Sequence, residues 1–207
     1  MGKNKGLLVV LSAPAGCGKD TVLSALLAKT DQVKKSVSAT TRAPRPGEVD
    51  GVDYIFEEKD SFRAAVDRGE FLEYATYCDE YYGTPRGPVF RWLEQGIDVI
   101  LKIEVQGGAQ IKQLVPECVS IFLLPPSMQE LENRLRGRGT ETEEKIRQRL
   151  HTAAGEMRSA HEYDYIVYND TVEKAVEDIL TIIAAEKLRF TRDPDAVERM
   201  LSYAETL

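Results

Sequence analysis

Cysteine and histidine are scarce in this sequence of 207 residues, and neither residue occurs in a metal-binding pattern. The three cysteines, Cys17, Cys78 and Cys118, are isolated and odd in number, and His151 and His161 belong to no metal motif. Their spacing argues against a zinc site and against a disulfide framework. It indicates reduced thiols, and we therefore predict a cytoplasmic location.

Long hydrophobic runs are also missing, and no segment approaches the length that crosses a membrane. Lys3 and Lys5 precede an apolar run at residues 7–11, as they would in a signal peptide. That run is shorter than an export segment and leads directly into a glycine-containing turn, so we expect no export.

Positive charge is in deficit, with 27 lysine and arginine residues against 34 aspartate and glutamate residues and a net charge of −7. Proteins that mainly coat nucleic acid need clustered net positive charge, so we expect neither a nucleic-acid nor a membrane partner. No low-complexity linker or internal repeat divides the chain, and its 43% hydrophobic content suffices for one core with inserted subdomains. We expect a monomer or a small homo-oligomer.

The stretch near the N-terminus combines a strand with a glycine-rich turn. Apolar residues 7–11 predict a short strand that is buried on both faces. Gly16 and Gly18 permit a tight turn whose N–H groups face inward, and a helix is expected from there to about Lys29. Lys19 adds positive charge where that helix presents its positive end. Together these features predict a phosphate-binding loop.

The loop departs from the usual phosphate-loop pattern at two positions. Ala13 replaces its first glycine, and Asp20 replaces the hydroxyl residue after the lysine, although Thr21 still offers a hydroxyl. Asp20 could contact Mg²⁺ directly, act through water or only balance charge, and a turn without a ligand is the alternative for the whole stretch. Cys17 is interpreted as a small residue that fills the turn, with a reactive thiol as the alternative.

Strand and helix signals alternate along the rest of the chain. Apolar segments at 99–105, 119–124 and 165–168 predict further buried strands, each followed by a helix signal. We therefore predict an α/β doubly wound parallel sheet with ligands at the carboxyl ends of its strands. Residues from about 31 to 97 are too many for one strand–helix–strand connection and predict an insertion with its own small sheet.

The insertion and its surroundings carry two polar constellations. Arg42 and Arg45 lie among hydroxyl residues in a proline-stiffened loop and could clamp a phosphate, with a solvated loop as the alternative. Alternation along 71–77 places Glu73 on one face, near the tyrosine-rich turn at 81–84. This predicts a base-binding pocket, with an ordinary half-exposed strand as the alternative.

A third constellation follows the apolar segment at 119–124. Ser127 and Glu130 form a capping box for a helix that we expect to end near Gly137, and Thr140 is expected to open the next helix. Arg134 and an arginine four residues later share a face if the helix continues, and the adjacent glycines predict a mobile lid. An exposed helix with many ion pairs is the alternative.

Six motifs, taken in order, resemble those of guanylate kinases, and the resemblance spans about Leu7 to Arg189. They are Gly16-x-Gly18-Lys19, Ser38-x-Thr40-Thr41-Arg42-x-Pro44-Arg45-x-Gly47-Glu48, Phe71-x-Glu73, Tyr81-Tyr82-Gly83, Ile103-Glu104-x-Gln106-Gly107 and Arg134-Leu135-x-Gly137-Arg138-Gly139-Thr140. The resemblance implies a P-loop nucleoside monophosphate kinase that transfers the γ-phosphoryl group of ATP to GMP or dGMP, with Mg²⁺ bound to ATP. Its implied fold is a P-loop doubly wound parallel sheet core with an inserted GMP-binding flap and an arginine-bearing lid.

The resemblance also implies site residues, which are given by their numbers in this sequence. The implied GMP-binding residues are Ser38, Arg42, Arg45, Tyr54, Glu73, Tyr82, Thr84 and Glu104. The implied ATP-binding residues are Ala13, Pro14, Ala15, Gly16, Cys17, Gly18, Lys19, Asp20, Thr21, Arg134, Arg138 and Asn169. The implied catalytic residues are Lys19, Arg42, Arg138 and Arg149. No side chain is assigned as a metal ligand, with Asp20 as the one candidate, and Lys102 stands where guanylate kinases usually carry an acid.

The chemistry of guanine agrees with this resemblance. Guanine presents N–H donors at N1 and N2, which suit the carboxylates of Glu73 and Glu104, and its O6 can accept from Thr84. Adenine lacks that donor pair, so we expect selectivity for guanine. No general base is needed, because the attacking oxygen of a nucleoside monophosphate is already anionic.

The expected domain organisation follows from these assignments. We predict a core at 1–35 and 96–189 with a lid at about 126–150, a GMP-binding insertion at 36–95, and a C-terminal helix at 190–207. A non-catalytic guanylate-kinase-like interaction module and a P-loop kinase for another nucleotide are the alternatives. An interaction module would have no reason to keep the loop lysine together with arginines in the lid.

Overall fold

The computed structural model describes residues 5–77, 79–137 and 142–204. Five parallel strands form its central sheet in the order β2-β7-β1-β8-β9. Their bounds are β1 (Leu8–Ser12), β2 (Val33–Lys35), β7 (Asp98–Lys102), β8 (Val119–Leu124) and β9 (Tyr165–Tyr168). This sheet confirms the predicted α/β doubly wound class.

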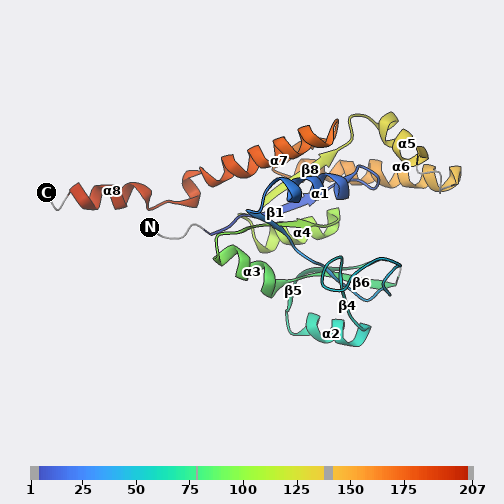
Figure 1. The fold of residues 1–207 in the computed structure, drawn as a ribbon, viewed down its shortest axis with the longest axis horizontal. Coiled ribbons are helices and arrows are strands. Elements are labelled where there is room, and N and C mark those ends of the chain that lie inside the picture. Colours follow the sequence, from blue (N-terminus) through green and yellow to red (C-terminus); the bar gives the residue numbers. More distant parts are fainter. Residues whose placement is uncertain (1–4, 78, 138–141, 205–207) are drawn as a thin grey trace.

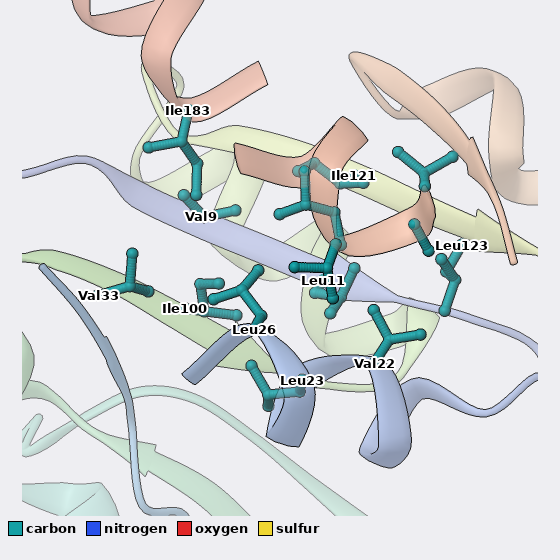
Figure 2. Close-up of a cluster of buried hydrophobic side chains, with 14 of the residues drawn as sticks. Val9, Leu11, Val22, Leu23, Leu26, Val33, Ile100, Ile121, Leu123 and Ile183 are labelled. Atoms are coloured by element: carbon teal, nitrogen blue, oxygen red, sulfur yellow. The ribbon is translucent and has the colours of Figure 1, made fainter. Parts of the chain in front are cut away.

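Helices cover both faces of the sheet. Helices α1 (Lys19–Lys29) and α7 (Val172–Lys187) pack on one face, and α3 (Arg86–Glu94) and α4 (Val105–Leu114) pack on the other. The side chains of β1 alternate between the two cores, so every residue of this strand is buried as predicted. Figure 2 shows Leu26 of α1 and Ile183 of α7 in the same buried cluster as Val9 and Leu11 of β1. Each fully buried leucine or isoleucine of this cluster stabilises the fold by about 1.5–3 kcal/mol.

The insertion forms a separate sheet of four strands in the order β4-β3-β6-β5. Its elements are β3 (Ala39–Thr40), β4 (Ile55–Phe56), α2 (Lys59–Asp67), β5 (Phe71–Tyr77) and β6 (Glu80–Pro85). Phe62 of α2 is fully buried and stacks on Phe71 and Tyr81, at ring-centroid distances of 4.4 and 5.4 Å. Figure 1 shows this sheet and α2 below the central sheet.

The remaining helices lie toward the C-terminus. They are α5 (Met128–Gly137), α6 (Glu143–Met157), the 3₁₀ turns η1 (Arg158–Glu162) and η2 (Phe190–Arg192), and α8 (Ala196–Ala204). Leu131 and Leu135 of α5 pack on Ile146 and Ala153 of α6. Helix α8 projects away from the rest of the molecule (Figure 1). No helix in the described ranges is both long and apolar enough to cross a membrane.

Several predicted boundaries were wrong. The strand expected at 99–105 ends at Lys102, and α4 begins at Val105, because Glu104 takes the extended conformation of a helix N-cap. Ser127 caps α5 as predicted, but α6 is capped by the side chain of Thr142, which accepts from Lys145 N; the expected cap, Thr140, lies outside the described residues. The turn expected at 81–84 is strand β6.

Candidate active site

The glycine-rich loop follows β1 at the carboxyl edge of the central sheet. The chain leaves β1 toward β2 on one side and later leaves β7 toward β8 on the other, so the loop lies at the topological switch point. Gly16 and Gly18 have φ angles of 93° and 91°, which glycine adopts without strain. A Cβ atom at Gly18 would also lie only 2.8 Å from Asn169 Nδ2. Both glycines are therefore required by the loop conformation.

Lys19 connects this loop to the end of β7. Its Nζ donates to the carbonyl oxygen of Ile103 at 3.1 Å and to Glu104 Oε1 at 3.2 Å. The Lys19 side chain is 11% exposed, whereas that of Glu104 is 72% exposed. A lysine fixed at the first residue of α1 adds its charge to the N–H groups of that helix end, which is a favourable place for a phosphate anion.

Cys17 packs inside the loop. The residue is buried, its Sγ lies 3.5 Å from the Leu123 carbonyl oxygen, and burial raises the pKa of the thiol to about 12. Since only the thiolate is strongly nucleophilic, the interpretation of Cys17 as a small filling residue holds and the alternative of a reactive thiol was wrong.

Arg134 and Asn169 converge on the same loop. Arg134 of α5 donates to the carbonyl oxygen of Cys17 at 3.4 Å and to that of Asn169 at 3.1 Å, while its Nε pairs with Glu130. The buried Asn169 side chain donates to the Cys17 carbonyl oxygen at 2.7 Å. The structure thus brings together three of the residues predicted to bind ATP.

Of the other two arginines predicted in the lid, Arg149 lies within the described residues and Arg138 does not. Arg149 is half-buried on α6, on the helix that packs against α5. The predicted catalytic residue Arg138 lies outside the described residues.

Arg42 is the centre of a second charged cluster, in the insertion. Its guanidinium donates from both terminal nitrogens to Glu48, at 2.8 and 2.9 Å, and lies 5.3 Å from the centre of the Tyr54 ring. The rings of Tyr54 and Tyr82 meet edge to face with centroids 6.1 Å apart. Hydrogen bonding to Arg42 lowers the pKa of Glu48 to about 2 and raises that of Arg42. Three predicted GMP-binding residues are therefore adjacent.

Two further predicted GMP-binding residues, Arg45 and Ser38, make contacts through their backbone atoms. The side chain of Arg45 is exposed, and its contacts with Glu48 are made by the backbone: Arg45 N donates to Glu48 Oε2 at 2.7 Å, and the Arg45 carbonyl oxygen accepts from Glu48 N at 3.0 Å. Ser38 is half-buried just before β3, and its carbonyl oxygen accepts from Ile55 N at 2.9 Å.

Glu73 lies in the small sheet opposite Thr84. Antiparallel pairing of β5 and β6 sets these two residues side by side, and Thr84 Oγ1 donates to Glu73 Oε1 at 2.6 Å. Glu73 is only 7% exposed, and this burial raises the pKa of its carboxyl group. Glu104, the other acid predicted near guanine, is exposed and bonded to Lys19.

The first turn of helix α4 packs closely against the Glu73 carboxylate. Gly107 in its first turn is buried, and a Cβ atom there would lie 2.8 Å from Glu73 Oε2. The same turn begins next to Glu104, which contacts Lys19. The two predicted nucleotide sites therefore meet at the start of α4.

The sequence interpretation did not assign two carboxylates that the structure places in the site. Glu156 of α6 accepts the backbone N–H of Ala15 in the loop at 3.2 Å, and no local pattern links residues so far apart in the chain. Glu48 holds Arg42, and here a signal existed, because an acid follows two arginines within the same short loop.

A parallel α/β sheet with a lysine-bearing phosphate loop at its switch point, next to an arginine cluster and a buried carboxylate, defines a P-loop nucleotide kinase. The family model described as guanylate kinase matches residues 5–186. The chain belongs to the guanylate kinase family.

Individual relatives agree with this assignment. The chain is 50% identical over 194 residues to the guanylate kinase of Desulfitobacterium hafniense, covering 94% of this chain and 97% of that protein. It is 51% identical over 192 residues to the guanylate kinase of Halalkalibacterium halodurans, covering 93% and 94%. The crystal structure of guanylate kinase from Anaplasma phagocytophilum is similar, with a TM-score of 0.79, 34% identity, and coverage of 97% and 96%. The predicted family and the prediction of an enzyme are confirmed.

Proposed function

We propose that this chain transfers the γ-phosphoryl group of ATP to GMP or dGMP, releasing ADP and the guanosine diphosphate. The observation that carries the proposal is the buried carboxylate of Glu73, bonded to Thr84 in the same small sheet as the Arg42 cluster. A buried acceptor of this kind suits the N–H donors of guanine and leaves adenine without a matching donor pair.

The test of this function is acceptor specificity. The purified protein is incubated with Mg²⁺ and ATP, and ADP release is measured with GMP, dGMP, AMP, CMP or dTMP as acceptor. We expect turnover with the guanine nucleotides alone. Equal turnover of AMP would contradict the assignment of the base site.

On the donor side, the loop binds the phosphates of ATP. The N–H groups of the loop and the ammonium group of Lys19 supply fixed positive charge. Lys19 would exchange its present contact with Glu104 for a phosphate oxygen, because the doubly charged γ-phosphate is the stronger acceptor. Arg134 would hold α5 against the loop through its contacts with the Cys17 and Asn169 carbonyl oxygens.

On the acceptor side, Arg42 binds the GMP phosphate. Its planar fork is already aligned by Glu48, so little side-chain freedom remains to be lost on binding. Tyr54 and Tyr82 line the same cluster, and Ser38 and Arg45 complete the proposed phosphate site. The protein then has to align the two phosphates and exclude water, and Arg138 and Arg149 are proposed to neutralise the transferred group.

Mg²⁺ bound with ATP completes the proposal. No group of three or more His, Cys, Asp or Glu side chains that could hold a metal ion occurs among the described residues. This fits Mg²⁺, which proteins usually bind through one or two carboxylates together with substrate phosphates and water. The exposed Asp20 carboxylate and Thr21 hydroxyl are the oxygen donors available at the loop. The ion neutralises charge on the phosphates when it is bound.

The organisation predicted from the sequence is part of the same proposal. The small sheet supports a GMP-binding insertion at 36–95, and the packing of α5 on α6 supports a lid at about 126–150 within the core. Cys17 and Cys118 are free and buried, which suits a reducing cytoplasm. The net charge of −7 supports small-molecule substrates over nucleic acid, with a monomer or small homo-oligomer as the expected state.

Replacing Arg42 with alanine is expected to raise the KM for GMP by roughly 10- to 100-fold, the usual effect of losing hydrogen bonds to a charged group. The KM for ATP should stay within about threefold of the wild-type value. Arg42→Lys should be intermediate, because it keeps the charge and loses the fork. Steady-state kinetics with each substrate varied in turn measure both constants. Arg63→Ala, an exposed arginine over the Tyr81 ring in the same insertion, is the matched control. An unchanged KM for GMP in Arg42→Ala would exclude the clamp.

Replacing Gly107 with alanine is expected to raise the KM for GMP about tenfold, because the new Cβ atom displaces the Glu73 carboxylate by several tenths of an ångström. The fold should persist, since the atom that is pushed is the end of a side chain. Gly155→Ala on α6 is the matched control, because a Cβ atom there would have no neighbour within 4 Å. Equal KM values for both variants would show that Glu73 does not depend on α4.

A further inference from the structure

Asp20 and Lys102 form an ion pair beside the phosphate loop, and the proposed mechanism assigns no role to Lys102. Asp20 is the second residue of α1, immediately after Lys19, and Lys102 is the last residue of β7. Lys102 Nζ donates to Asp20 Oδ1. The Lys102 side chain is 27% exposed and that of Asp20 80%, so the lysine approaches from the sheet and the carboxylate lies at the surface of the loop.

The pair and its two charged neighbours, Lys19 and Glu104, form two separate ion pairs. Lys102 holds Asp20, while Lys19 donates to Glu104 and to the carbonyl oxygen of Ile103. Lys19 is also close enough to Asp20 to lower the pKa of that carboxyl group electrostatically, and so is Lys102. Three lysines therefore act electrostatically on Asp20, and the carboxylate is bonded to Lys102 and not to Lys19.

The protonation states agree with this arrangement. Burial is the largest single effect and acts against ionisation of both partners, but their mutual hydrogen bond and the field of the nearby charges together outweigh it, so the pKa of Asp20 is lowered and that of Lys102 is raised. Both groups are therefore charged at neutral pH. Tyr54 and Glu104 are the other groups whose field acts on Lys102, and Lys35 is the remaining cation whose field acts on Asp20.

We propose that Lys102 is a positioning residue that holds the Asp20 carboxylate away from Lys19 and thereby keeps the phosphate loop competent to bind a nucleotide. Without Lys102, the Asp20 carboxylate turns either to Lys19 or toward the incoming phosphates. In the first position the carboxylate neutralises the Lys19 charge that binds phosphate. In the second position it repels the nucleotide phosphates. The inference rests on the proposed function only in that the loop binds nucleotide phosphates.

A double-mutant cycle tests this role. ADP binding is measured by calorimetry in EDTA, without metal, for the wild type, Lys102→Met, Asp20→Asn and the double variant. We expect Lys102→Met to weaken ADP binding about tenfold in the wild-type background. In the Asp20→Asn background the same change should lower the affinity for ADP by less than about threefold, because no carboxylate remains to be released.

The outcomes separate the alternatives. Equal losses in both backgrounds would mean that Lys102 attracts phosphate directly, and no loss in either would mean that the pair is irrelevant; each result overturns the proposal. A wild-type protein that does not bind ADP would overturn the proposed function instead.

Three further variants test whether any change in affinity reflects positioning. Lys102→Arg keeps a cation at this position and should bind ADP within about threefold of the wild type, whereas a tenfold loss would contradict the proposal. Lys174→Met removes an exposed ion pair to Asp178 on α7 and should leave ADP binding unchanged. Melting temperatures are measured for every variant, and Lys102→Gln replaces Lys102→Met in the cycle if the methionine variant does not fold.

Discussion

Lys19→Met is expected to lower kcat/KM for ATP by roughly 10³-fold, the upper range for loss of one preorganised donor at a developing charge. The ammonium group is fixed at the start of α1 by the Ile103 carbonyl oxygen and Glu104, so no other group can take its place without rearrangement. Methionine keeps the length and apolar character of the side chain and removes only the charge and its donors.

The measurement is ADP release at saturating GMP with ATP varied, together with thermal unfolding to show that the variant folds. Lys29→Met is the matched control, because this lysine lies at the other end of the same helix and pairs only loosely with Glu177, at 3.7 Å. Activity above about a tenth of the wild-type value in Lys19→Met would contradict the assignment of Lys19 to phosphoryl transfer.

Glu73→Gln is expected to lower kcat/KM for GMP by an amount on the order of 10³-fold and to change the KM for ATP by less than about threefold. The ionised carboxylate can accept two N–H donors from guanine, whereas an amide offers one acceptor and turns a donor toward donors. The preference for GMP over IMP, which lacks the N2 amine, should shrink in the variant. A GMP preference equal to that of the wild type would contradict the base site.

The same variant is expected to unfold at a higher temperature than the wild type at pH 7. Burial raises the pKa of Glu73 above its unfolded value, so its contribution to stability is full below the unfolded pKa and is lost as the pH rises through the folded pKa. At pH 7 the wild type carries the free-energy cost of a buried carboxylate, and glutamine removes that cost. The gain in melting temperature should vanish at pH values below the ordinary range of a carboxyl group, where Glu73 is protonated in both the folded and the unfolded state. Glu70→Gln, an exposed acid just before β5, is the control. A lower melting temperature at pH 7 would contradict the electrostatic account.

The parts of the site that sequence predicted are those fixed by local geometry. The strand, the two glycines and Lys19 lie within a dozen residues, so hydrophobic pattern and turn chemistry suffice to place them. Glu73 was assigned a face by alternation along a strand, whereas its pairing with Thr84 was not predicted, because residues 81–84 were expected to form a turn. The class of the fold followed from alternating strands and helices in the same way.

The rest depends on which strands are neighbours, and no local pattern contains that information. Asp20 meets Lys102 because β7 lies beside β1 with Leu11 opposite Lys102, although the two residues are far apart in the chain. Glu156 reaches Ala15 only because α6 returns over the loop. The short strands β2 and β3 have two or three residues each, too few for a periodic signal.

The first turn of α4 touches both halves of the site, since Glu104 holds Lys19 and Gly107 supports Glu73. A ligand that draws Lys19 away from Glu104 changes the charge at one end of this turn, while a ligand on Glu73 loads the other end. The affinities for donor and acceptor are then thermodynamically linked. If bound donor changes the affinity for acceptor by some factor, bound acceptor must change the affinity for donor by the same factor.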